Sequence, residues 1–157
     1  MKATVRIEMG IMAGVIASVV MTLAIIALTA VSSASDGFFP IQWFSWVGAV
    51  FGTSGIPYQV AEAGVAWFVA LGIVAGLVYA FAFRIHTVYG GLGMGLIAWF
   101  IVALYLTFET APQLSGSLGS LGIAASIELL LPLAVCFGLW GLAMGYVGAK
   151  YLPQGAG

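Results

Sequence analysis

The sequence predicts an all-α, polytopic membrane protein with four transmembrane helices, and two observations support this class. Only 6% of its 157 residues are charged and 63% are hydrophobic, whereas a soluble globular domain carries about 25% charged residues. The charges also divide the chain into long uncharged runs, several of which reach the roughly 20 apolar residues that cross a bilayer as a helix. We therefore expect a single transmembrane domain over residues 1–157.

Four segments have the length and composition of membrane spans. The first covers residues 9–31 and is longer than the apolar region of a signal peptide, which is about 7–15 residues. We therefore interpret it as a retained span, although SSAS at 32–35 resembles a cleavage site. The other spans cover about 63–83, 90–108 and 129–149, and the Ser- and Gly-rich stretch 110–127 is expected to be a loop that ends in a helix start.

The first outer loop is expected to hold an amphipathic helix at the membrane interface, at about residues 39–51. Trp43 and Trp46 would anchor it, because indole rings favour the level of the lipid headgroups. Pro and Gly residues within 37–61 argue against an unbroken span. A re-entrant segment and a lid over a binding site are the alternatives. The apolar face consists of Phe39, Trp43, Trp46, Val47 and Val50.

The basic residues predict how the spans are oriented. Lys2 and Arg6 precede the first span, Arg84 lies between the second and third, and Lys150 follows the fourth. With four spans these places share one side of the membrane, which the positive-inside rule identifies as the cytoplasm. The expected location is the cytoplasmic (inner) membrane of a prokaryote, with both termini in the cytoplasm.

Weak internal similarity indicates two hairpins that form a parallel repeat. An offset of 81 residues aligns the first span with the third, and an offset of 66 aligns the second with the fourth. The aligned pairs include Gly10 with Gly91, Gly14 with Gly95, Gly72 with Gly138, and Glu62 with Glu128. Chance identities among small and apolar residues are frequent in membrane helices, so duplication and coincidence are both open.

Small residues recur at intervals of four along the spans, which places them in stripes where helix backbones can approach closely. We expect these stripes to pack helices together, within this chain or against a partner; a surface for a flat cofactor is the alternative. The stripe residues are Gly10, Gly14, Ser18, Thr22, Gly72, Gly76, Gly91, Gly95, Gly141 and Gly145. The large residues Trp67, Phe68, Trp99, Phe100 and Trp140 are expected to face lipid or a partner subunit.

Few side chains could take part in chemistry. His86 could be an axial ligand of haem or a pigment, but a lone His beside Arg84 is more typical of a solvated or capping residue. Glu62 and Glu128 each lie where an outer helix begins, and a carboxylate there gains about 0.3–1 kcal/mol from the helix dipole. The alternative is an ion or proton site, because ionisable groups at membrane depth often mark pathways.

The segments GVIASVVMT, GIVAGLVYAFAF and GLWGLAMGYVGA resemble helices of small uncharacterised prokaryotic four-helix integral membrane proteins. The resemblance covers most of the chain but lies in packing motifs of low specificity. It implies the four-helix fold and no activity.

We expect a non-catalytic accessory subunit of a larger membrane complex, such as a respiratory or other energy-transducing assembly. No catalytic residue, metal site or cofactor is expected. The expected partners are the lipid bilayer, bound lipid and other membrane subunits, and a net charge of −1 argues against nucleic acid. The alternative is a small oligomeric transporter or channel that uses Glu62 and Glu128.

Overall fold

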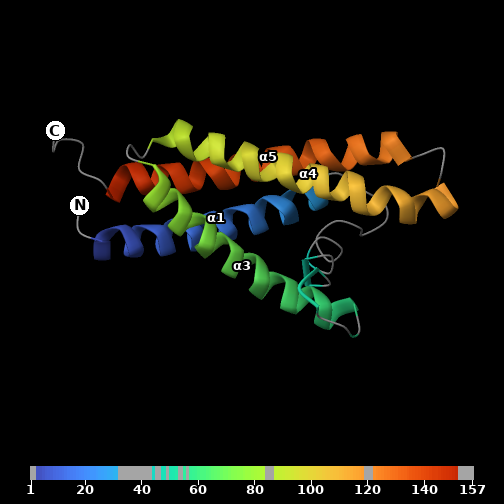
Figure 1. Ribbon diagram of the computed structural model, residues 1–157, viewed down its shortest axis with the longest axis horizontal. Helices are drawn as coiled ribbons and strands as arrows, with labels where there is room; N and C mark the ends of the chain where they lie inside the picture. The colour runs from blue at the N-terminus through green and yellow to red at the C-terminus, as the bar shows by residue number, and fades with distance from the viewer. Residues whose placement is uncertain are drawn as a thin grey trace.

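The computed structural model describes residues 3–31, 44, 47, 48, 50–52, 55, 57–83, 87–118 and 122–151. Side chains are described over 3–27, 59–83, 87–104 and 131–151, and at the described positions between 44 and 55. Four long helices make up this part of the chain (Figure 1). They are α1 (Ala3–Val31), α3 (Pro57–Ala82), α4 (Val88–Leu118) and α5 (Gly122–Tyr151).

Three of these helices are long and apolar enough to cross a membrane, over Ala3–Ala27, Gln59–Ala82 and Leu131–Tyr151. The apolar part of α4 with described side chains, Val88–Leu104, is shorter. Large hydrophobic side chains lie exposed along all four helices, as expected where the surrounding solvent is hydrocarbon. The predicted all-α fold is confirmed, with three helices that have the length and composition of membrane spans, and the fourth span stays a prediction.

The predicted loop over residues 110–127 is wrong. Helix α4 continues to Leu118 and α5 begins at Gly122, so most of this stretch is helical. Low helix propensity of Ser and Gly is a weak preference that the surroundings readily override. Pro132 also lies inside α5. Proline has no backbone N–H to bond within the helix, and neighbouring helices can compensate for that missing hydrogen bond. With 31 residues α4 is about 45 Å long, more than the roughly 30 Å of a hydrocarbon core.

The helices form two close pairs joined along one seam. Helix α1 packs on α3, α4 packs on α5, and α1 packs on α5. Among the described residues no comparably extensive contact joins α3 to α4. Figure 1 shows that α1 begins, α5 ends, and α3 is followed by α4 at the same end of the bundle. The core lies along the α1–α5 seam, where fully buried residues include Ala17, Met21, Leu133, Cys136 and Met144.

The α1–α3 pair depends on backbone contact between glycines. A Cβ added at Gly14 would fall on the Gly72 carbonyl, and one added at Gly76 would fall on the Gly10 carbonyl and lie 2.8 Å from the Gly14 nitrogen. Any side chain at these positions would separate the helices. Contact at this distance yields dispersion energy over many backbone atoms, which is how helices associate in lipid.

The α4–α5 pair has the same kind of crossing. A Cβ added at Gly95 would fall on the Phe137 carbonyl and lie 3.0 Å from the Gly141 Cα, and one added at Gly91 would meet the Gly145 backbone. Both pairs therefore bring main chain against main chain at two successive glycines.

The described residues between α1 and α3 pack on α3. A Cβ added at Gly48 would fall on the Val60 carbonyl, and the Phe44 ring meets Phe68 edge-on at 5.9 Å. Positions 44, 47, 48 and 50 have helical backbone. Trp43 and Trp46 lie outside the described residues, so the interfacial helix at 39–51 stays a prediction. A turn at Gly52, with φ of +79°, precedes α3, which begins with a proline, the residue that best fits a first helical position.

Replacement of Gly95 by Ala should lower the free energy of unfolding by about 1–3 kcal/mol, because the added methyl overlaps the Phe137 carbonyl. Gly93, on the same helix, is the matched control: nothing lies within 4 Å of its Cβ position. Gly93→Ala should leave the stability unchanged or raise it by up to about 1 kcal/mol through helix propensity. Unfolding in mixed detergent micelles measures both, and equal losses at the two positions would contradict the described crossing.

Candidate functional site

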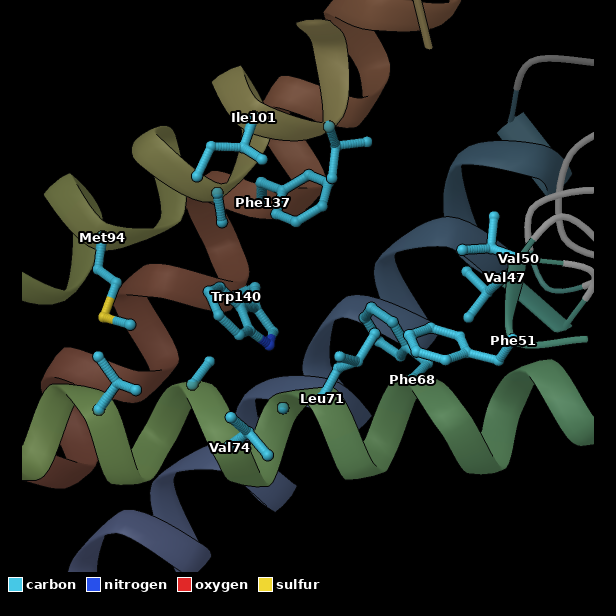
Figure 2. Close-up of a pocket in the computed structure, with 15 residues that line it drawn as sticks. Val47, Val50, Phe51, Phe68, Leu71, Val74, Met94, Ile101, Phe137 and Trp140 are labelled. Atoms are coloured by element: carbon cyan, nitrogen blue, oxygen red, sulfur yellow. The ribbon is translucent and has the colours of Figure 1, made fainter. Parts of the chain in front are cut away.

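A groove separates α3 from α4 and forms the candidate functional site (Figure 2). Its cavity volume is about 500 Å³, and its walls are almost entirely apolar. Helix α3 contributes one wall with residues that include Leu71 and Val74, and α4 contributes the other with Met94 and Ile101. Val74 and Ile101 are 57% and 61% exposed, so the groove is accessible from the lipid side.

Aromatic rings occupy the inner part of the groove. Phe68 projects from α3, and Phe137 and Trp140 project from α5. The Phe137 and Trp140 rings meet edge-to-face with centroids 6.2 Å apart. At the far end the groove is bounded by Val47, Val50 and Phe51. These rings lie between α3 and α4, which make no extensive contact with each other among the described residues.

This placement corrects one prediction. Phe68 and Trp140 do not face lipid: they are only 6% and 5% exposed. The separation of α3 and α4 creates an interior position for large rings that the sequence pattern alone did not reveal. Trp67 and Phe100 are exposed, as expected, and Trp99 packs partly against the core.

Two buried polar atoms accompany the groove. Trp140 Nε1 and Ser18 Oγ have no hydrogen-bond partner among the described residues. Figure 2 shows the Trp140 indole inside the groove with its nitrogen directed toward α3. Ser18 is fully buried on α1, where its Oγ lies against Gly72, itself a residue of the groove wall. An unpaired buried donor costs about 1–3 kcal/mol of stability. Such a group in a folded protein therefore calls for an explanation, of which a role in binding is one.

A hydrogen bond fixes the end of the groove where α3 is followed by α4. The Tyr79 hydroxyl donates to the Thr87 carbonyl at 3.0 Å, and Tyr79 is fully buried. The Thr87 hydroxyl in turn accepts a hydrogen bond from the Gly90 amide in the first turn of α4. These bonds tie the start of α4 to α3 at this end.

The glycines of the predicted small-residue stripes lie at the helix crossings. Within the part of the chain that the structure describes, the predicted ion-site and ligand residues are not brought together at one place. Thr22 does not reach a neighbouring helix through its hydroxyl, which donates to the Ser18 carbonyl at 2.8 Å. Glu62 is exposed on α3, and the Glu128 side chain lies outside the described residues, as does all of His86. Among the described residues no group of three His, Cys, Asp or Glu could hold a metal ion.

The glycine crossings indicate a different register for the second half of the internal repeat. Gly14 meets Gly72 and Gly95 meets Gly141, so the contacts align the second and fourth spans with an offset of 69, not 66. At an offset of 69 Glu62 aligns with Leu131 and not with Glu128. The same offset pairs Phe68 with Phe137, Gly76 with Gly145, Val78 with Val147 and Ala80 with Ala149. Duplication itself stays a prediction.

The chain matches no known protein family, no curated relative and no solved structure.

Proposed function

We propose that the protein is a non-catalytic integral membrane subunit that packs against another membrane protein through α4. The larger assembly would be of the respiratory or another energy-transducing kind. The observation that carries this proposal is an empty notch at Gly93. Nothing lies within 4 Å of the Cβ position of Gly93, whereas Gly91 and Gly95 on the same helix are each covered by α5.

The notch lies within a row of exposed side chains. Ile97, Phe100 and Leu104 follow Gly93 at helical spacing and are 61%, 56% and 42% exposed. A small residue among bulky ones lets a second backbone approach and gives side chains on both helices room to interdigitate. Close approach of two helices at glycines already occurs in the α1–α3 and α4–α5 pairs. This supports the same kind of contact between α4 and a partner helix.

The proposal includes an orientation. Arg6 lies near the start of α1 and Lys150 in the last turn of α5, and these two helix ends lie at the same end of the bundle (Figure 1). Under the positive-inside rule this end faces the cytoplasm of a prokaryotic cell. The longer extensions of α4 and α5 then lie on the outer side.

Replacement of Gly93 by Leu should release the partner, because a leucine would fill the notch. We expect the variant to lose most of the protein that co-purifies with wild type from native membranes in mild detergent. Its own unfolding free energy should be unchanged or rise by up to about 1 kcal/mol, since the site is open within the chain and Leu has a higher helix propensity than Gly. Quantitative mass spectrometry of the purified material measures the loss.

Ala70→Leu is the matched control, because Ala70 is also an exposed small residue on a membrane helix but lies on α3. It should leave co-purification unchanged. Recovery of wild type alone, as a homogeneous oligomer of this chain, would overturn the subunit proposal.

The transporter alternative has a separate test. Joint replacement of Glu62 and Glu128 by Gln removes the two outer carboxylates while keeping their size. We expect proton and cation flux in reconstituted vesicles to be indistinguishable for wild type and the double variant. A flux present in wild type and abolished in the variant would favour the transporter over the subunit.

A further inference from the structure

We infer that the groove between α3 and α4 binds an uncharged, lipid-soluble carbonyl compound, of which a quinone with a hydrocarbon tail is the simplest example. The Trp140 indole N–H would donate a hydrogen bond to its carbonyl oxygen. This inference goes beyond the proposed function and depends on a different face of α4.

The apolar lining of the groove favours a ligand whose body is apolar. The cavity of about 500 Å³ falls within the range of about 300–1,000 Å³ typical of small-molecule sites. Among the described residues no charged side chain lines it, and the lining extends from Met94 near the start of α4 to Val50 and Phe51 at the other end. An elongated hydrocarbon tail fits such a groove, and a charged group would be desolvated there without a partner.

The unpaired indole N–H of Trp140 favours a ligand that carries a hydrogen-bond acceptor. Trp140 is 95% buried, given its 5% exposure, and its Nε1 has no partner among the described residues. The nitrogen lies between the groove walls on the α3 side of the ring (Figure 2), but almost none of its surface is accessible, so the indole must rotate to donate to a ligand. An indole N–H can only donate, so the complementary group is a hydrogen-bond acceptor, such as a carbonyl oxygen. A partner helix of hydrophobic side chains would leave the donor unpaired, because helical carbonyls are already bonded within their own helix.

The depth of Trp140 in the bilayer distinguishes a dissolved carbonyl compound from a phospholipid as the ligand. Trp140 precedes Lys150 by ten residues, which corresponds to about 15 Å along α5. A hydrocarbon core about 30 Å thick therefore places the donor near its middle, when Lys150 lies at the boundary. The ester carbonyls of a phospholipid lie at that boundary and not at the middle. A mobile carbonyl compound dissolved in the hydrocarbon reaches this depth.

The test measures binding of a ¹³C-carbonyl-labelled ubiquinone analogue with a ten-carbon tail to the full chain in phosphatidylcholine nanodiscs. Wild type should bind one molecule per chain and lower the carbonyl stretching frequency relative to the free quinone. Trp140→Phe should abolish the frequency shift and weaken binding about fivefold to tenfold, the effect of one lost hydrogen bond. Trp67→Phe is the matched control and should change neither, because Trp67 does not line the groove and a phenylalanine keeps a ring stacked on Phe51 at its end.

Ala98→Leu supplies a second variant in case Trp140→Phe does not fold. Ala98 lines the groove from α4, so the larger side chain should block binding while the donor remains. An unshifted carbonyl frequency in wild type, or equal competition by an alkane without oxygen, would contradict the inference. So would a retained phospholipid that the quinone does not displace. None of these results bears on partner binding at Gly93, so the two proposals fail separately.

Discussion

Direct backbone contact at paired glycines is the constraint on which the rest of this structure depends. In lipid there is little hydrophobic gain from bringing two apolar helices together, so association requires close packing. Gly14 against Gly72 and Gly95 against Gly141 provide it, because carbonyl oxygens occupy the space that a Cβ would take. Each contact fixes both the distance and the crossing position of a helix pair. The two pairs then join along the α1–α5 seam, where small and flexible side chains fill the core.

The groove follows from this arrangement. Once α1 and α5 are in contact and each is tied to its own partner, α3 and α4 make no comparably extensive contact among the described residues. Phe68, Phe137 and Trp140 fill the inner space between them, and the outer space stays open. The site is therefore a consequence of packing elsewhere, and among the described residues that line it Trp140 Nε1 is the unpaired donor to which a ligand can bind specifically.

Much of the fold could be predicted from the sequence because its strongest signals are local. Uncharged runs reveal membrane helices, and glycines four apart reveal the faces that pack. The extent of α4 and α5 could not be predicted, since the Ser- and Gly-rich stretch around 110–118 is helical despite its composition. The groove was also missed, because it depends on which helix pairs do not touch. The available signal was the alignment of Phe68 with Phe137 at the same offset as Gly72 with Gly141.

The width of the groove between α3 and α4 provides the sharpest test of this packing. Spin labels at Val74→Cys and Ile101→Cys, in a Cys136→Ala background, lie on opposite walls at exposed positions. Labels at Leu92→Cys and Gly138→Cys report on the tight α4–α5 pair, where the Leu92 Cδ1 lies 3.8 Å from the Gly138 Cβ position. In bilayers the distance between the labels should be clearly shorter for the second pair than for the first. An equal or shorter distance across the α3–α4 groove would contradict the described packing.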